Sequence, residues 1–350
     1  MADIDGLATY PGATGGPAGF SGPGTPEVQD ALRLRLNWHR GGIEGAAQMS
    51  AVIDAAMAVA CGLARHVLVY RTVTEATEQG AGGRAGIGGG APSIGGSMQW
   101  SIPFRAYSAA CWLAVNAHRH FHEFGTTREH LGMIPVNQRR NAGLNPKAIY
   151  RDPMTLEDYL SARMITTPFG LYDCDVPCDG STAVIVSAAD YAPDTPRPAV
   201  AFEAVGTALR GRPSWDQFDD ATTMSARDAA ASMWERTSLR PSDVDVAELY
   251  DGFSFLTLTW IEALGFCARG EGGPFIEGGS RIALDGELPV NTHGGQLSAG
   301  RLHGYGFIHE AVVQLRGDGG ARQVAGPVEV VAVANGGGPV AGCMLLTRRR

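Results

Sequence analysis

The sequence predicts an α/β fold made of two similar halves, because a paired glycine, an amphipathic helix and a short apolar strand occur twice along the chain. The first copy comprises Gly41-Gly42, residues 46–63 and residues 66–70, and the second comprises Gly294-Gly295, residues 308–315 and residues 328–334. Continuous apolar strands of this length are typical of parallel sheets covered on both faces. A duplicated unit of this kind buries its two helices side by side between two sheets, with the glycine turns about a pseudo-twofold axis.

The length of 350 residues fits two fused halves, since single cores stop growing at roughly 250–300 residues. We place the N-terminal half at residues 1–190, with an inserted loop region at about 80–170, and the C-terminal half at residues 191–350. The 48 glycines cluster in loops, which indicates that tight turns build much of any site.

The composition excludes several classes of function. Hydrophobic residues make up 44% and charged residues 18% of the chain, and the net charge is -8 without a basic stripe, which argues against nucleic acid and anionic membranes as partners. The chain has no apolar run long enough to span a membrane, and its first residues lack a basic flank followed by an apolar stretch. We therefore expect a cytoplasmic protein without a membrane span or signal peptide.

The remaining elements are helices and strands joined by loops. Residues 1–27, rich in Gly, Pro and Thr, predict a loop, and residues 80–96 predict either a loop that covers a ligand or a disordered excursion. Thr155, followed three residues later by Asp158, predicts a helix N-cap. Helical periodicity is found at residues 27–36, 102–124, 155–164, 225–237 and 253–264. Apolar, β-rich segments are found at residues 182–187, 199–205 and 342–347, and residues 244–250 lead to a turn at Gly252.

The histidines and cysteines do not predict a metal site. His118, His120 and His122 alternate along an expected helix and so point to different faces, which favours positions in solvent. Cys174 and Cys178 alone are too few for zinc, which is bound by four ligands in structural sites. The six cysteines follow no disulfide framework, so we expect reduced cysteines, most of them in apolar surroundings.

The segment from Asn291 to Glu310, NTHGGQLSAGRLHGYGFIHE, is the first candidate for a functional site. It places two adjacent glycines, three histidines, an arginine and a tyrosine directly before a helix-like apolar run. Paired glycines before a helix let the backbone approach a ligand closely and direct free N–H groups at negative charge. The alternative is a plain strand-to-helix turn whose histidines lie in water.

Four motifs, found in the order of the family, give the chain a resemblance to the thiolase superfamily. They are residues 155–186, AELYDGF at 247–253, LPVNTHGGQLSAG at 288–300 and ANGGG at 334–338. The resemblance extends from about Gly41 onward, and it is strongest to the branch of sterol carrier protein X-type thiolases and lipid-transfer-protein-like aldolases of steroid side-chain breakdown. It implies a duplicated, five-layered α/β/α/β/α fold in a tight homodimer, and it implies that the family's opening strand and helix would precede Met1.

The chain departs from thiolases at each catalytic position. Thiolases carry a nucleophilic cysteine before the helix that begins near Ala46, but residues 38–48 contain no Cys, Ser or Thr. We expect Cys61, further along the same helix, to face the core. The second family cysteine falls on Ala334, and the histidine of the family's Gly-His-Pro motif falls on Arg301. Without a nucleophile no acyl-enzyme forms, so thiolase chemistry is not expected.

The aldolase branch, which the chain resembles best, also lacks these cysteines. The resemblance implies retro-aldol cleavage of a β-hydroxyacyl-CoA with a steroid side chain, which releases a short acyl-CoA and a carbonyl product. This reaction needs an acid/base for the hydroxyl proton and donors for the enolate, and the CoA thioester is a substrate rather than a resident cofactor. The aldolases that this chain resembles carry a tyrosine at the position of Tyr250. The resemblance therefore implies that Tyr250 is the acid/base. A tyrosine pKa of about 10 then calls for a nearby cation, such as Arg301 or a histidine.

The second catalytic group is less defined, because the aldolases carry a tyrosine near the position of Arg301. We rank the candidates in the order His303, Tyr305, His293. The alternatives are that Tyr305 is a buried ring that caps the helix and that His293 is a turn residue bonded to backbone. The substrate-binding positions that the resemblance implies are Asp251, Gly294, Gly295, Asn335, Gly336 and Gly337. Among these, Asp251 orients Tyr250 or caps the next helix, and the N–H groups of Gly295 and near Gly337 serve as oxyanion donors.

The resemblance also implies a partner. The aldolases work with a small protein that has an OB-fold and a zinc ribbon, so we expect a heterotetramer with two copies of each chain. A second hypothesis of a different class is a non-catalytic thiolase-like subunit that binds an acyl-CoA or a sterol and supports a catalytic partner. The missing cysteines and Arg301 are compatible with both hypotheses, and the substitution Tyr250→Phe distinguishes them.

Overall fold

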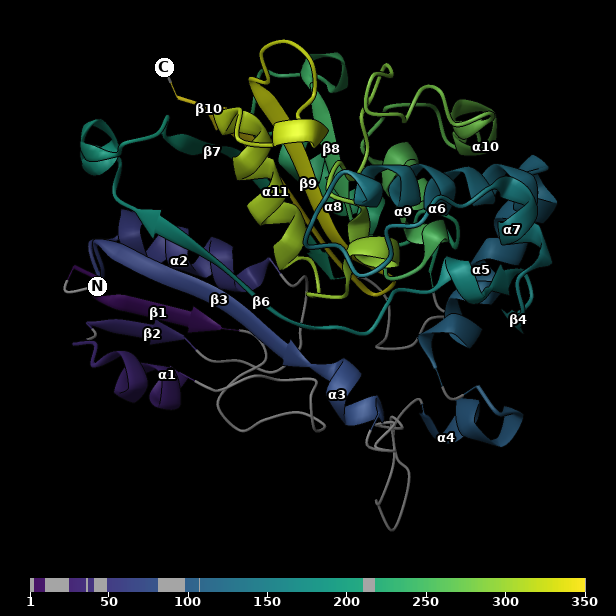
Figure 1. Cartoon of the computed structure of the whole chain (residues 1–350), viewed down its shortest axis with the longest axis horizontal. Coiled ribbons are helices and arrows are strands. Elements are labelled where there is room, and N and C mark those ends of the chain that lie inside the picture. The colour runs from purple at the N-terminus through teal and green to yellow at the C-terminus, as the bar shows by residue number, and fades with distance from the viewer. Residues whose placement is uncertain are drawn as a thin grey trace.

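Five layers of helices and sheets make up the protein (Figure 1). The computed structural model describes residues 3–9, 25–35, 37–40, 49–80, 98–106, 108–209 and 218–349. Two four-stranded sheets enclose an inner pair of helices, and further helices cover the outer face of each sheet. This arrangement confirms the predicted α/β/α/β/α class.

The N-terminal sheet has the strand order β2-β1-β3-β6. Its strands are β1 (Gly6–Thr9), β2 (Trp38–Arg40), β3 (His66–Thr74) and β6 (Asp179–Ser187). The first three run parallel, and β6 pairs antiparallel with β3 along its whole length, from His66↔Ser187 to Thr74↔Asp179. Helix α1 (Thr25–Leu32) packs against β1 on the outer face, and α2 (Ser50–Ala60) lies on the inner face.

The C-terminal sheet has the strand order β7-β10-β9-β8. Its strands are β7 (Val200–Leu209), β8 (Val246–Leu249), β9 (Val330–Gly337) and β10 (Val340–Arg348). Helices α8 (Ala226–Trp234) and α9 (Ser254–Ala263) cover the outer face, and α11 (Tyr305–Arg316) lies on the inner face. Since β8 and β9 are parallel, both strands end at the edge of the sheet where α11 begins.

Apolar side chains of α2 and α11 form the core between the sheets. Val52 and Ala55 of α2 and Ile308 and Ala311 of α11 are buried in one cluster with valines of β3, β8 and β9. The two alanines among them let the helices and the sheets approach closely. The predicted pair of helices between two sheets is therefore confirmed. Packing in this core fixes the positions of the helix ends relative to the strand ends.

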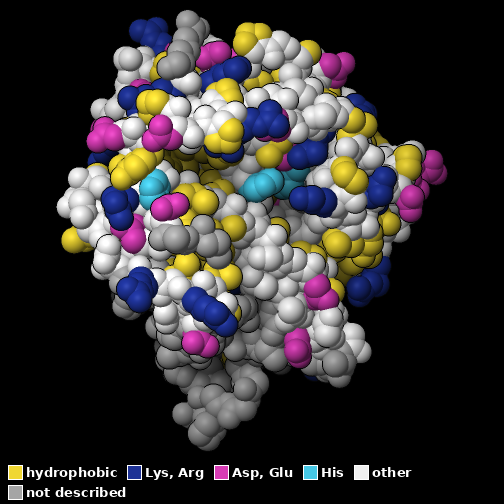
Figure 2. All heavy atoms as spheres, turned by 60° about the vertical axis from the view of Figure 1, so that its left-hand side comes forward, with side chains coloured by type: hydrophobic (Ala, Val, Ile, Leu, Met, Phe, Trp, Pro, Cys, Tyr) yellow, Lys and Arg dark blue, Asp and Glu magenta, His cyan; other side chains and the backbone are white. Residues whose placement is uncertain are grey.

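A cleft of about 1460 Å³ opens beside these helices, between the edge strands β6 and β7. Figure 2 shows that face of the molecule, where apolar and histidine side chains border the hollow. Val52 and Val59 of α2 and His309 and Val312 of α11 contribute to the lining. The lining does not include Tyr250, so this cleft is separate from the predicted site.

A region of helices lies beside the C-terminal half (Figure 1). In chain order its elements are α4 (Met98–Ser101), η1 (Ile102–Phe104), α5 (Ala109–Phe124), α6 (Arg128–Gly143), α7 (Leu156–Ser161), β4 (Met164–Thr166), β5 (Phe169–Gly170) and η2 (Leu171–Asp173). The short elements elsewhere are α3 (Glu75–Gly80), η3 (Ala189–Asp194), η4 (Pro241–Asp243), α10 (Gly272–Ile276), η5 (Gly295–Ala299) and η6 (Gly320–Arg322). No helix among the described residues is long and apolar enough to cross a membrane.

Helix α6 is the largest element that the sequence pattern did not reveal. It contains Pro135, which normally breaks a helix, and its buried face carries polar side chains such as Asn137 and Asn141. These amides donate to backbone carbonyl groups of the opposite loop, for example from Asn141 to Val290 at 3.2 Å. Because a polar buried face has no hydrophobic period, the hydrophobic pattern of the sequence does not predict this helix.

Three further expectations about single elements are wrong. The loop expected at residues 1–27 contains a buried strand, β1, at Gly6–Thr9. His120 does not lie in solvent, because it is fully buried and contacts Glu262 Oε1 at 2.8 Å and Thr126 Oγ1 at 2.9 Å. Cys61 does not face the core, because it follows the last turn of α2 and is exposed.

Other expectations have clear outcomes. The N-cap is confirmed, since Thr155 and Asp158 form a reciprocal capping box at the start of α7. All six cysteines are free. The paired glycines Gly41-Gly42 and almost all of the loop expected at residues 80–96 lie outside the described residues.

Candidate active site

Tyr250 stands at the carboxyl end of β8, where the sheet meets the first turn of α11. Its backbone N–H donates to the carbonyl oxygen of Ala334 at 2.9 Å, which extends the pairing of β8 with β9 by one residue. A Cβ atom built on Gly252 would lie 3.1 Å from the Tyr250 hydroxyl oxygen, so the phenol ring folds back over this glycine. The ring is half-buried and meets the edge of Phe307 at a centroid distance of 6.4 Å.

Arg301 is held by two carboxylates and lies close enough to Tyr250 for their charges to interact. Its Nε donates to Glu75 Oε2 at 2.8 Å, and its Nη1 donates to Asp175 Oδ1 at 3.0 Å. Burial lowers the pKa of Arg301, but the charges of Asp175 and Glu75, and further that of a Tyr250 phenolate, raise it above its usual value. Burial raises the pKa of Asp175 to about 6, although Arg301 opposes the shift. A permanent cation is thus fixed beside the predicted acid/base.

His303 is part of the same charged cluster. It is only 3% exposed, it has a left-handed backbone (φ 50), and its Nδ1 lies 2.5 Å from Nη2 of Arg71. Arginine only donates hydrogen bonds, so Nδ1 accepts and the ring proton is on Nε2, 3.5 Å from Glu75 Oε1. Burial and the charges of Arg71 and Arg301 hold the pKa of His303 well below its usual value. His303 is therefore neutral and has no proton to donate on the side of Arg71.

Tyr305 opens α11 and is 1% exposed within the core cluster between the two sheets. Burial raises its pKa above the usual value for tyrosine. Its hydroxyl group has no hydrogen-bond partner within the part of the chain that the structure describes. These contacts match the alternative of a buried ring at the start of the helix.

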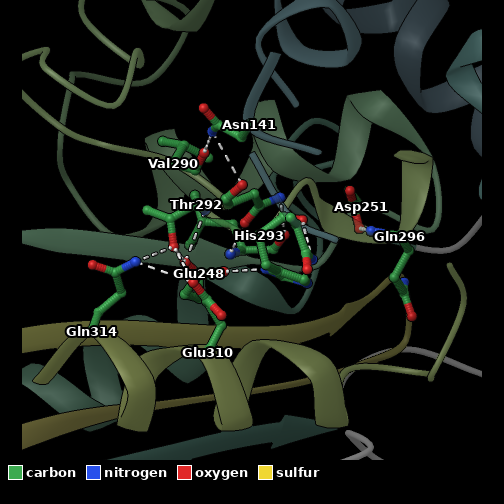
Figure 3. A network of polar contacts seen from close by, with 12 residues as sticks. Asn141, Glu248, Asp251, Val290, Thr292, His293, Gln296, Glu310 and Gln314 are labelled. Atoms are coloured by element: carbon green, nitrogen blue, oxygen red, sulfur yellow. Dashed lines mark hydrogen bonds and ion pairs between the residues drawn. The ribbon is translucent and has the colours of Figure 1, made fainter. Parts of the chain in front are cut away.

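His293 belongs to a different cluster, which is built on carboxylates (Figure 3). Its Nδ1 lies 3.1 Å from Glu248 Oε2, and its ring meets Phe307 edge-on at 5.3 Å. Phe307 therefore contacts both His293 and Tyr250. Burial alone would lower the pKa of His293, but the hydrogen bond and charge of Glu248, with a smaller contribution from Glu310, raise it. The expected alternative of a backbone-bonded turn residue is wrong, because the imidazole binds a carboxylate.

Asp251 holds the glycine turn in place. The expectation that it orients Tyr250 or caps α9 is wrong. Its carboxylate accepts from the backbone N–H groups of Gln296 at 2.9 Å and Leu297 at 3.2 Å (Figure 3). Gly295 has a left-handed backbone (φ 59), and any Cβ atom there would overlap Asp251 Oδ2. Burial raises the pKa of Asp251 to about 7, although the two N–H groups oppose the shift. The turn is a short π-helix, η5, a feature that often marks functional sites.

The other predicted glycines and Asn335 shape the backbone around this turn. A Cβ atom on Gly294 (φ 105) would lie 2.6 Å from Ala142 Cβ of α6, so glycine lets α6 pack closely. Asn335 is fully buried, and its amide donates to the Gly304 carbonyl at the start of α11, at 3.4 Å. Gly337 (φ 138) ends β9 against Leu256. These residues connect β9, α6 and α11 around the site.

The sequence analysis missed the acidic residues that determine the electrostatics of the site. Glu75 follows the carboxyl end of β3, and Glu248 precedes Tyr250 by two positions on β8 and so faces the same side of the strand. Carboxylates at strand ends and inside apolar strands are unusual enough to be a signal. Asp175 and Arg71 gave no local signal, because only the tertiary fold brings them to Arg301 and His303.

Comparison with known proteins identifies similar chains. Residues 208–347 match the family described as Thiolase C-terminal domain-like. The chain is 35% identical to "Steroid side-chain-cleaving aldolase" of Thermomonospora curvata, over 98% of this chain and 87% of the relative. It is 36% identical to "17-hydroxy-3-oxo-4-pregnene-20-carboxyl-CoA lyase" of Mycobacterium tuberculosis, over 86% of this chain and 79% of the relative.

Among solved structures, "Ltp2-ChsH2(DUF35) aldolase" superimposes with a TM-score of 0.86 and 32% identity, over 99% of this chain and 88% of that chain. The sequence similarity and the structural similarity thus lead to the same group of proteins, and both extend over nearly the whole chain. The chain belongs to the thiolase superfamily, in the branch of the steroid side-chain-cleaving aldolases, which are carbon–carbon lyases.

Proposed function

We propose that Tyr250 and Arg301 carry out retro-aldol cleavage of a β-hydroxyacyl-CoA. The observation that carries this proposal is the position of Arg301, which Glu75 and Asp175 fix within electrostatic range of the Tyr250 phenol. A cation beside a phenol favours its ionised form, which is the form that accepts a proton. The absence of a thiolase nucleophile at residues 38–48 and at Ala334 is compatible with chemistry that needs no acyl-enzyme.

The reaction balances with two proton transfers. Tyr250 takes the proton of the β-hydroxyl group, the new carbonyl forms, and the bond between the α and β carbons breaks. The electron pair of this bond stays with the α carbon and forms the enolate of the leaving thioester. Backbone N–H groups at a glycine turn are suited to stabilise this enolate. A second group then protonates the α carbon, and the product is a saturated acyl-CoA. The reaction requires no resident cofactor, and the CoA thioester enters as substrate.

We propose His293 as the second group, ahead of His303 and Tyr305. His293 shares Phe307 with Tyr250, and its raised pKa favours the cation, which is the form that donates a proton. His303 is kept neutral by two arginines, and Tyr305 is enclosed in the core. Their positions argue against direct proton transfer to a substrate.

The names of the relatives support a steroid side chain as the acyl group. The acyl-CoA that is released is then short, with acetyl-CoA and propionyl-CoA as the candidates. We propose a cytoplasmic complex in which a homodimer of this chain binds two copies of a small OB-fold, zinc-ribbon protein, since the similar solved structure names a DUF35 component. Size-exclusion chromatography of the chain alone and after co-expression tests the complex, and a fully active homodimer without partner would rule the second component out.

Product analysis by mass spectrometry tests the reaction itself. The wild-type protein, with and without the partner, is incubated with a steroid β-hydroxyacyl-CoA, and the products are compared with those of Tyr250→Phe. We expect a short acyl-CoA together with a carbonyl-bearing core, and a loss of rate of about 10²–10⁴-fold in the variant, because general acid–base groups contribute that much. Tight binding of the substrate without any turnover would contradict the proposal and favour a non-catalytic binding subunit.

A further inference from the structure

We propose that Glu248 is a positioning residue for this reaction: it holds the Nδ1 hydrogen of His293, so that Nε2 of His293 delivers the proton to the α carbon of the leaving acyl-CoA. The inference rests on the proposed retro-aldol function and adds its second proton transfer. A histidine in this role needs a fixed tautomer, and the hydrogen bond at one ring nitrogen determines what the other nitrogen does.

Glu248 is placed for this role by the strand that carries Tyr250. It is fully buried on β8, two positions before Tyr250, so one short strand supports both reacting side chains. Its Oε2 contacts His293 Nδ1 at 3.1 Å. Its Oε1 accepts from the backbone N–H of Thr292 at 3.0 Å, which fixes the carboxylate plane relative to the turn. The carboxylate thus has no freedom to leave His293.

A second buried carboxylate, Glu310 of α11, completes the cluster (Figure 3). The Thr292 hydroxyl oxygen lies 2.7 Å from Glu248 Oε1 and 3.0 Å from Glu310 Oε1, so both acids meet at one hydroxyl group. Gln314 donates to the same hydroxyl oxygen and to Glu310, at 3.1 Å each. Two carboxylates this close repel each other and need cations nearby.

The cations stand at the two ends of the cluster. Arg322 donates to both oxygens of Glu310, from Nε at 2.8 Å and from Nη2 at 2.9 Å. At the other end, His293 is the partner of Glu248. With His293 protonated and both carboxylates ionised, the four side chains have no net charge. Burial and the charge of Glu310 raise the pKa of Glu248, whereas the hydrogen bond and charge of His293 lower it, so the ionised carboxylate depends on the imidazolium. The charge balance therefore favours a cationic His293 in the free enzyme.

The other nitrogen of His293 is directed away from the cluster. Nε2 has no hydrogen bond to any residue that the structure describes, and the side chain is 11% exposed. A Cβ atom on Gly306 would lie 3.5 Å from Nε2, so the absent side chain of this glycine leaves space over the nitrogen. Phe307 contacts both the ring of His293 and the ring of Tyr250.

The pH response of His293 depends on every charged group around it. These groups are Glu248 of β8, Asp251 after this strand, His309 and Glu310 of α11, and Arg322 of η6. The acids favour the cation of His293, and Glu248 is the one in direct contact. A neutral amide at this position keeps a hydrogen-bond acceptor but removes the charge.

Nitrogen NMR of protein labelled with ¹⁵N-histidine tests the pair without using activity. We expect His293 of the wild type to be protonated on Nδ1 throughout and to titrate above the usual histidine pKa. In Glu248→Gln the pKa of His293 falls by about one unit or more, since an opposite charge shifts a pKa by that amount, and Glu248→Asp restores part of the shift. A wild-type His293 with its only proton on Nε2, or no change in Glu248→Gln, overturns the inference.

Gly306→Ala is the second variant, because it adds one methyl group beside Nε2 and alanine favours the helix. We expect an unchanged NMR titration of His293, an unchanged KM and a kcat lower by at least about tenfold, because small displacements of a reacting group cost that much. In Glu248→Gln the limb of the kcat profile that reports the acid shifts to lower pH. An unchanged kcat in both variants, with an active wild type, overturns the inference alone, whereas an inactive wild type overturns the proposed function as well.

Discussion

Two histidines on one segment, His293 and His303, are both almost fully buried, yet their environments have opposite effects on their protonation. His293 contacts a carboxylate, and its pKa is raised despite burial. His303 contacts Arg71 and lies near Arg301, and burial together with these charges holds its pKa well below the usual value. Burial is the same in both cases, so the sign of the partner charge decides which ring is a proton donor.

The difference has a structural cause. His293 precedes the glycine turn and faces β8 and the middle of α11, where Glu248 and Glu310 are buried. His303 follows the turn and faces β3, which contributes Arg71. The turn therefore separates a histidine whose direct partner is a carboxylate from a histidine whose direct partner is an arginine, and the charge of Arg301 acts on Tyr250. A base next to the arginine and an acid next to the carboxylates is the arrangement that a retro-aldol reaction requires.

The largest effect is expected from replacing the two histidines by asparagine. His293→Asn removes the proposed acid and lowers kcat by about 10²–10⁴-fold. His303→Asn lowers kcat less than about tenfold, because asparagine accepts the left-handed backbone at this position and the neutral ring is not the proposed proton donor. Steady-state kinetics with the acyl-CoA substrate measures both. Equal losses in the two variants would break the comparison.

A smaller effect on the rate is expected from Asp175→Asn, next to Arg301. Asp175 has a pKa of about 6, so it takes up a proton as the pH falls through that value and stops neutralising Arg301. The wild-type rate then changes with an inflection near pH 6. The asparagine side chain carries no charge at any pH, so this inflection disappears from the pH–rate profile of the variant. The rate of the variant stays within about tenfold of that of the wild type. Persistence of the inflection in the variant would assign it to another group.

The partner charge at His303 is itself testable. Arg71→Gln removes the cation that contacts Nδ1, so the pKa of His303 rises by about one unit or more in a ¹⁵N NMR titration. The titration of His293 serves as the internal control, because the charges that act most strongly on it are those of Glu248, Glu310 and Asp251. A His303 pKa that does not change would mean that burial alone lowers it, and the comparison with His293 would lose its basis.

The smallest effect on activity is expected from a third buried histidine, His120. It pairs with Glu262 at 2.8 Å, as His293 pairs with Glu248, but it lies between α5 and α9. His120→Gln lowers the free energy of unfolding by about 1–3 kcal/mol, because the bond of Nδ1 to the buried Thr126 hydroxyl group is lost, and it leaves kcat unchanged. Urea denaturation and kinetics measure the two quantities. A loss of kcat without a loss of stability would show that a buried histidine–carboxylate pair acts on catalysis from a distance.

The two inner helices could be predicted from the sequence because their signals are periodic. The glycine pair, helix and strand of each half can be read from hydrophobic spacing, and they place α2 and α11 correctly between the sheets. Helix α6 was missed because its buried face is polar and contains Pro135. The strand at Gly6–Thr9 was missed because four residues among many glycines and prolines give no period.

The site was only partly predictable for a related reason. Tyr250 is recognisable from the motif that contains it, and Arg301 from its departure from the family histidine at that position, but the order of the three second-group candidates depends on partners that are far away in the chain. Glu248 and Arg71 decide between His293 and His303, and neither is next to them in sequence. The sign of a pKa shift is therefore a property of the folded protein.

The most direct test of the account is the reaction carried out in deuterium oxide. Retro-aldol cleavage leaves an enolate that must take its proton from the enzyme, and an exchangeable group on the enzyme carries deuterium. We predict that the released acyl-CoA contains a solvent deuterium on its α carbon, and that the carbonyl product carries none from the cleavage step. Release of an acyl-CoA without deuterium at the α carbon would contradict the account, because no enolate would then have formed.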